Sequence, residues 1–118
     1  MGQEKLFENK IKGVLKKNEA WFIKYWAGSQ FTKNGIPDIL SCVNGYFLAI
    51  EVKAANGKPS ELQLYTVDKI NEAGGFAIVL YPKDYETFLD LIYDLRNGYY
   101  SGARKLVKMI NKGANKNE

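Results

Sequence analysis

Two carboxylates, Asp38 and Glu51, are spaced so that one tight hairpin would set them side by side. Asn44-Gly45 lies between them and is flanked by apolar runs. This dipeptide is the strongest short-range signal for a two-residue hairpin, because both central residues of a type I′ turn need positive φ. Counting outward from the turn puts Asp38 directly opposite Glu51, with Cβ atoms roughly 4.5–5.5 Å apart. Like charges placed so closely repel, and something must offset that repulsion.

Strand alternation places Lys53 on the same face as Glu51. Two carboxylates and an ammonium at the end of a hairpin indicate a site for a hard divalent cation with oxygen ligands. In the alternative, Asp38 closes the turn at Pro37 and Glu51 pairs with Lys53 on a solvated edge. Both strands of the hairpin are apolar on both faces, as in a sheet covered on two sides, and this favours the site.

The composition narrows the chemistry further. A chain of 118 residues should be one domain with room for a core. It contains no stretch of 18 apolar residues, and its first residues are not basic, apolar and small in the order typical of a leader, so we expect neither a membrane span nor a signal peptide. Its single cysteine, Cys42, fits a reducing compartment, so we expect a cytoplasmic protein without a membrane span. The absence of histidine excludes serine and cysteine triads and most zinc sites. Catalysis would therefore use carboxylates, lysine and metal.

Positive charge is concentrated near the C-terminus. The net charge of +4 divides into +5 after residue 95 and −1 before it. A basic segment on a neutral body suggests contact with a polyanion such as DNA, although a solvated tail explains the charge equally well. The candidate contacts in this segment are Arg104, Lys105 and Lys108. A polar loop expected over residues 27–35, which could also be a plain connector, adds Ser29, Lys33 and Asn34.

Two elements should precede the hairpin. Apolar residues at helical spacing predict an amphipathic helix over residues 3–17, and the aromatic run at 21–26 predicts a strand. Glu4 lies within the apolar stripe of the helix and Glu8 at its edge, so either could reach the site as a further metal ligand. Each could instead be a surface charge paired with neighbouring lysines.

The elements after the hairpin complete the expected fold. Ser60 and Gln63 have the form of a capping box, which predicts a helix that ends at Gly74-Gly75. A strand over residues 76–80 should then lie parallel to the Glu51 strand, because a strand, helix and strand in succession form a right-handed crossover. Apolar spacing predicts a closing helix over residues 85–95.

The C-terminal segment is expected to form a basic helical extension or tail. A short basic helix over residues 101–110 is plausible, and residues 111–118 should be frayed. This organisation divides the chain into residues 1–95 and a basic extension over residues 96–118.

Pro37-Asp38, followed thirteen residues later by Glu51-Val52-Lys53, resembles the motif of the PD-(D/E)XK nuclease superfamily. Within it, the chain up to about residue 80 is similar to the small VRR-NUC (virus-type replication-repair) nucleases of phage, and more distantly to Holliday junction resolvases. The resemblance implies an α/β fold with a restriction-endonuclease-like α-β-β-β-α-β core, in which helices flank a mixed central sheet.

The same resemblance implies Mg²⁺- or Mn²⁺-dependent hydrolysis of DNA. Asp38, Glu51 and the main-chain carbonyl of Val52 would bind the metal, and Lys53 would orient or deprotonate the attacking water. A glutamate of the first helix usually completes such sites, and Glu8 matches the spacing slightly better than Glu4. Gln63 matches the polar residue at the start of the helix after the motif.

The expected function is therefore that of a structure-specific endonuclease. Junction-resolving relatives act as homodimers on branched DNA, in a bacterial cell that a phage can infect. The alternatives left open are a nickase, a flap or restriction-like nuclease, and a non-catalytic DNA-binding module that keeps the fold.

Overall fold

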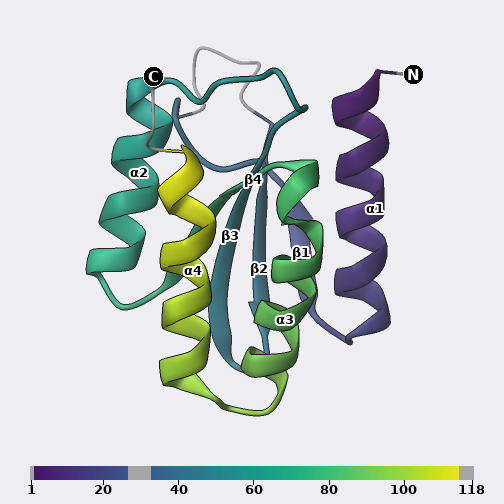
Figure 1. The fold of residues 1–118 in the computed structure, drawn as a ribbon, viewed down its shortest axis with the longest axis vertical. Helices are drawn as coiled ribbons and strands as arrows, with labels where there is room; N and C mark the ends of the chain where they lie inside the picture. The colour runs from purple at the N-terminus through teal and green to yellow at the C-terminus, as the bar shows by residue number, and fades with distance from the viewer. Residues whose placement is uncertain (1, 27–32, 115–118) are drawn as a thin grey trace.

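The structure is a computed structural model that describes residues 2–26 and 33–114. Within these residues the chain forms four strands and four α-helices (Figure 1). In chain order they are α1 (Gln3–Lys17), β1 (Trp21–Lys24), β2 (Ile39–Val43), β3 (Tyr46–Val52), α2 (Glu61–Glu72), β4 (Phe76–Leu80), the 3₁₀ turn η1 (Pro82–Asp84), α3 (Tyr85–Arg96) and α4 (Tyr100–Ala114). The expected α/β class is confirmed.

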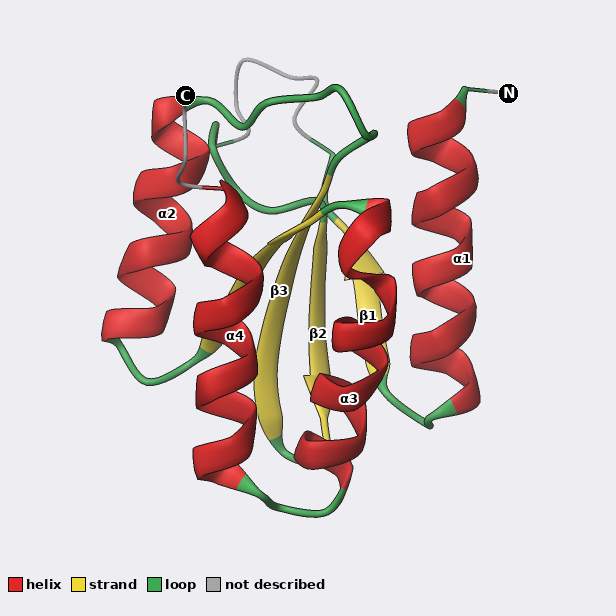
Figure 2. Cartoon of the chain, viewed as in Figure 1, coloured by secondary structure: helices red, strands yellow, loops and turns green. Residues whose placement is uncertain are grey.

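The strands form one mixed sheet in the order β1-β2-β3-β4. The first three strands are antiparallel, and β4 runs parallel to β3, as the crossover through α2 requires. Figure 2 shows α3 and α4 in front of the strands, with α1 and α2 to either side. The main core lies between the sheet and helices α1, α3 and α4, and a smaller apolar cluster lies under α2.

The hairpin has the predicted turn and register. Asn44 and Gly45 have φ values of 51° and 85°, so both occupy the left-handed region that a type I′ turn requires. Val43 pairs with Tyr46, and the ladder continues outward to Ile39 opposite Ile50. One further step places Asp38 opposite Glu51.

Local signals also located the neighbouring elements. Helix α1 has its predicted bounds, and β1 ends two residues earlier than expected, at Lys24. Both hydrogen bonds of the predicted capping box are present, since Ser60 N donates to Gln63 Oε1 and Gln63 N donates to Ser60 Oγ. Strand β4 is parallel to β3 as predicted.

The C-terminal helix is longer and better packed than predicted. Fraying from residue 111 is wrong for residues 111–114, which are helical, while residues 115–118 lie outside the described part of the chain. Asn111 explains part of the difference, because its side chain donates to Ala77 O and accepts from Val79 N on β4. Ala103, Val107 and Ile110 are buried in the main core. Residues 100–114 thus share the core of the preceding elements.

No helix within the described residues is long and apolar enough to cross a membrane.

Candidate metal site and nucleic-acid contacts

Asp38 is held by backbone hydrogen bonds at the end of the hairpin. Val52 N donates to Asp38 Oδ2 at 2.8 Å, and Tyr25 N donates to the main-chain oxygen of Asp38 at 2.8 Å. The first bond anchors the carboxylate to β3, and the second extends the pairing of β1 with β2 beyond the last strand residue. Asp38 is therefore fixed between the two neighbouring strands, and its Oδ1 is the oxygen that Val52 does not engage.

Glu51 is buried beside this anchored carboxylate. It is 2% exposed, and its Oε2 lies 3.4 Å from Nζ of Lys53. Its other oxygen, Oε1, is buried and has no hydrogen-bond partner among the residues that the structure describes. A carboxylate oxygen in that position costs free energy unless a cation or a proton compensates it.

The pKa of Glu51 is shifted by its burial and by its charged neighbours. Burial raises the pKa of Glu51, and the negative charge of Asp38 raises it further. Lys53 opposes both effects, and the balance places the pKa of Glu51 at about 7. The contribution of Asp38 agrees with the opposed positions that continuing the register of β2 and β3 gives to the two residues.

This donor set fits a divalent cation. Mg²⁺ keeps several waters and is usually bound by one or two carboxylates together with substrate phosphates. Asp38 and Glu51 supply two carboxylates. Oε1 of Glu51 has no hydrogen-bond partner among the described residues, so it is free to bind a cation. The described residues contain no cluster of three or more acidic, cysteine or histidine side chains that could hold a metal. Val52 as a main-chain ligand remains a prediction.

The two first-helix glutamates differ in their surroundings. Glu8 is buried and forms ion pairs with Lys5, Lys12 and Lys24, at 3.3, 2.9 and 2.7 Å. Burial pushes the pKa of Glu8 upward, but the bonds from Lys24 and Lys12 outweigh it and lower the pKa to about 2. The structure thus brings Glu8 to three lysines and does not add it to the carboxylate pair.

Glu4 lies one helical turn earlier and is exposed. Its negative charge contributes to the raised pKa of Glu51. The charge of Glu4 thus acts on Glu51, while Glu8 is linked to Asp38 through Lys24. Which of the two glutamates would reach a metal stays a prediction.

Lys24 is a site residue that the sequence reasoning missed. Its Nζ lies 2.7 Å from Glu8 Oε1 and 3.5 Å from Asp38 Oδ1, so it joins α1 to the carboxylate pair. Burial alone would lower the pKa of Lys24, but Glu8 and Asp38 raise it above its usual value. Lys24 is the last residue of β1 and pairs with Ile39, which is adjacent to Asp38. The register of β1 with β2 would therefore have placed Lys24 near the site.

Gln63 has a structural role in the described arrangement. Its side-chain oxygen accepts from Ser60 N in the capping box. A catalytic role would have to use its amide nitrogen, and remains a prediction.

The predicted DNA contacts divide into three groups. Lys33 and Asn34 are exposed and line a hollow beside α2, and Ser29 lies outside the described residues. Lys105 and Lys108 are exposed on α4. The four exposed residues are accessible to a phosphate backbone; they are Lys33, Asn34, Lys105 and Lys108.

Arg104, in contrast, is occupied within the fold. It donates to Asn71 Oδ1 at 3.0 Å and to Gly75 O at 2.9 Å, and its guanidinium stacks 4.1 Å from the ring centroid of Phe76. These contacts tie α4 to the end of α2 and the start of β4. Arg104 thus stabilises the fold.

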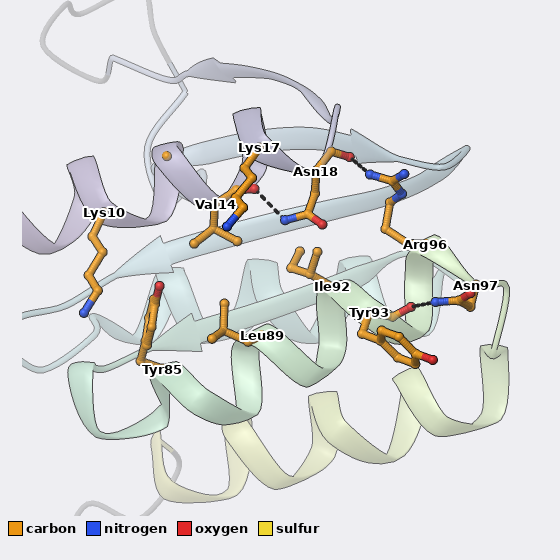
Figure 3. A pocket seen from close by; sticks show the side chains of 11 residues that line it. Lys10, Val14, Lys17, Asn18, Tyr85, Leu89, Ile92, Tyr93, Arg96 and Asn97 are labelled. Carbon is orange, nitrogen blue, oxygen red and sulfur yellow. Dashed lines mark hydrogen bonds between the residues drawn. The ribbon is translucent and has the colours of Figure 1, made fainter.

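A hollow of about 830 Å³ between α1 and α3 has a cationic rim (Figure 3). Lys10 and Lys17 come from α1, and Arg96 comes from α3 and donates to the main-chain oxygen of Asn18. None of the predicted site residues that the structure describes lines this hollow. Its positive rim was missed because it forms only when two distant helices pack together.

Comparison of the chain with models of protein families finds no match, and comparison with curated proteins finds no significant match.

Proposed function

We propose that this protein is a divalent-metal-dependent endonuclease that hydrolyses phosphodiester bonds in DNA. The observation that carries the proposal is the unpartnered buried oxygen of Glu51, which lies beside Asp38 and Lys53 at the end of β3. A stability role explains this arrangement poorly, because two opposed carboxylates and an orphaned oxygen destabilise the folded chain. A bound cation would remove the repulsion between the carboxylates and give the buried oxygen a partner, so this destabilisation of the metal-free protein favours cation binding.

Each site residue has a distinct role in this chemistry. Asp38 and Glu51 would hold Mg²⁺ or Mn²⁺, with Val52 as the expected main-chain ligand. A bound metal supplies a more acidic coordinated water and neutralises charge that develops on the phosphate. Lys53 is tied to Glu51 Oε2 at 3.4 Å and would orient the attacking water or the phosphate.

The reaction is a hydrolysis. The water oxygen bonds to phosphorus while the bond from phosphorus to one bridging oxygen breaks. The water loses one proton, and the departing oxygen takes up one proton to leave as a hydroxyl.

The element order supports the proposal. Helix, three strands, helix and strand follow one another up to β4, in the order that the PD-(D/E)XK resemblance implies. By the same resemblance the substrate would be branched DNA and the active form a homodimer. Exposed Lys33, Lys105 and Lys108 are the proposed backbone contacts.

The test is cleavage of a synthetic four-way junction and a matching linear duplex, each with Mg²⁺, Mn²⁺ or a chelator. We expect metal-dependent cleavage that favours the junction. Asp38→Asn, Glu51→Gln and Lys53→Ala should each reduce the rate by at least about 100-fold, the usual scale for removing a catalytic group.

Glu72→Gln is the matched control, because Glu72 is an exposed carboxylate at the far end of α2 and should leave the rate unchanged. Thermal unfolding of every variant separates lost chemistry from lost folding. Full cleavage by folded Glu51→Gln would overturn the proposed mechanism. DNA binding without cleavage in any metal would favour the non-catalytic alternative.

A further inference from the structure

The hollow between α1 and α3 has a cationic wall on the side of α1 (Figure 3). Lys10 and Lys17 line this wall seven residues apart, so about two helical turns, or roughly 10 Å, separate them along the hollow. Both residues are exposed. Nζ of Lys10 lies 4.0 Å from the ring centroid of Tyr85 on α3, and this contact holds the ammonium group at the hollow. The hollow therefore has two separate positive charges along its length.

These two charges are not neutralised within the described part of the chain. None of the described residues that line the hollow is acidic. The ion pairs of α1 use other lysines, since Lys5 and Lys12 pair with Glu8 at 3.3 and 2.9 Å. The described residues form no ion pair with Lys10 or Lys17. Both lysines are thus available to bind an anion.

One end of the hollow adjoins exposed aromatic rings. Tyr93 lines the hollow and is 61% exposed, and Tyr99, which follows α3, is 54% exposed. Their ring centroids lie 6.2 Å apart. Arg96 closes this end by donating to the main-chain oxygen of Asn18, and its guanidinium lies 3.6 Å from the exposed carboxylate of Glu19. Two tyrosine rings therefore face solvent beside the cationic wall.

The lining between the lysines and the rings is apolar, and it consists of Val14, Leu89 and Ile92. A ligand that uses the whole hollow must carry negative charges about 10 Å apart and flat apolar groups that cover the rings. A strand of nucleic acid has both, because it carries a phosphate and an aromatic base at every nucleotide. Proteins that bind single strands combine a cationic groove, which follows the backbone, with aromatic side chains on which bases stack.

We propose that the hollow between α1 and α3 binds a single strand of nucleic acid, with phosphates at Lys10 and Lys17 and a base stacked on Tyr93. Tyr85 positions Lys10, and Tyr99 extends the aromatic surface beyond Tyr93. The described residues of this hollow are separate from those of the candidate metal site. The inference therefore goes beyond the proposed cleavage and does not depend on it.

A single strand fits the hollow better than other polyanions do. The bases of a duplex are stacked on one another and paired, so they leave Tyr93 and Tyr99 uncovered. An acidic peptide would pair with the lysines but has no aromatic group at each residue. A single free nucleotide is too short to engage two lysines about 10 Å apart and a tyrosine at the same time. Only the unpaired strand uses the charges and the rings together.

The test is fluorescence anisotropy of a labelled thymidine strand of about twelve nucleotides, in chelator and over a range of salt concentrations. We expect Lys10→Ala and Lys17→Ala each to raise the dissociation constant by at least about 3-fold. Each should also reduce the slope of log affinity against log salt by about 0.7, the value for one phosphate contact to a single strand. Lys16→Ala is the matched control, because Lys16 is an exposed cation of the same helix that does not line the hollow. It should leave both quantities unchanged.

The aromatic contact is tested separately. Tyr93→Ala should raise the dissociation constant by at least about 5-fold, the lower end of the effect of losing one base stack. Tyr93→Phe keeps the ring and should bind as the wild type does. Thermal unfolding shows whether each variant is folded.

A second measurement uses the wild-type chain, in case a variant does not fold. A strand that carries bromodeoxyuridine is photocrosslinked to the protein, and we expect the crosslinked peptides to come from α1 or from residues 85–99. Crosslinks found only outside these segments would overturn the proposal, as would a wild-type chain that does not bind the strand. Folded Lys17→Ala and Tyr93→Ala with wild-type affinity would also overturn it.

Two competitors distinguish the other occupants. Polyglutamate or thymidine monophosphate that displaces the strand as well as unlabelled strand does, at equal concentrations of negative charge, would assign the hollow to an acidic peptide or to a free nucleotide and would overturn the proposal. Metal and cleavage play no part in these measurements, so a failed nuclease assay does not affect their result.

Discussion

Among the single residues, Glu51 is the one on which the proposed metal site mainly depends. Its buried side chain faces Asp38 and has one oxygen without a partner, and these features raise its pKa to about 7. The folded state therefore binds a proton at Glu51 more tightly than the unfolded chain does. Between pH 4.5 and 7 the folded state holds more protons, so this group makes stability fall as pH rises through that window.

This pKa predicts a pH-dependent gain in stability for Glu51→Gln. Raising the pKa from 4.5 to about 7 corresponds to about 3 kcal/mol of lost stability at pH 8. The neutral amide avoids most of this loss, so we expect a gain of about 1–3 kcal/mol at pH 8 and little change at pH 5. Urea unfolding in chelator measures both. An equal effect of the substitution at the two pH values would show that Glu51 is not the titrating group.

Lys24 supplies the second prediction at this scale. Lys24→Met removes the ammonium that pairs with Glu8 and lies 3.5 Å from Asp38 Oδ1. We expect a loss of about 1–3 kcal/mol in stability, because Glu8 stays buried with fewer partners. The affinity for Mn²⁺ should rise at the same time, because a competing positive charge has left Asp38. Unfolding and calorimetric titration measure the two effects, with exposed Lys105→Met as the control that should change neither.

The sequence located some of these residues and missed others for a physical reason. A two-residue turn sets the register of β2 with β3, so the Asp38–Glu51 pairing followed from counting. No tight turn connects β1 to β2, so nothing in the sequence placed Lys24 beside Asp38. Similarly, the helical pattern of α1 shows its apolar stripe but not its position along the sheet, so Glu4 and Glu8 could not be distinguished.

At the scale of elements, the segment that leads into β2 controls where Asp38 lies. Gly35 has a φ of +79°, and a Cβ there would approach Cγ of Leu62 to 2.5 Å. Only glycine combines this backbone conformation with so close an approach to α2. The loop before Asp38 is thus fitted against the helix that follows the hairpin.

Gly35→Ala should therefore destabilise the protein by about 1–3 kcal/mol, from the positive φ and the contact with Leu62. Adding Leu62→Ala to it should recover the part due to the contact. Gly13→Ala is the control, because Gly13 lies in α1 and a Cβ added there would meet no atom within 4 Å, and it should stabilise by about 0.5–1 kcal/mol. Thermal unfolding of the set measures these differences. Gly35→Ala with wild-type stability would contradict the proposed fit.

Helix α4 shows where sequence reasoning fails for a whole element. The sequence predicted a short basic helix with a frayed end, but the helix continues to Ala114 and its apolar residues pack into the core. Asn111 and Arg104 hold the helix through bonds to backbone oxygens of β4 and of the turn before it. Such long-range bonds from polar side chains have no local sequence signature.

At the scale of the whole molecule, the fold is a mixed four-stranded sheet with helices on both faces, and local signals predicted most of it. Apolar periodicity, a capping box and one tight turn gave element types and the strand directions. These local signals do not show how helices from distant parts of the chain pack together. The cationic hollow between α1 and α3 is an example.

We propose above that Asp38 and Glu51 together bind one divalent cation. The most direct test is calorimetric titration of Mn²⁺ into the metal-free protein at pH 8, without DNA. We expect a binding site that Asp38→Asn and Glu51→Gln each weaken by at least about 10-fold, while Glu72→Gln binds as the wild type does. Wild-type protein that binds no Mn²⁺, or variants that bind it unchanged, would contradict the account.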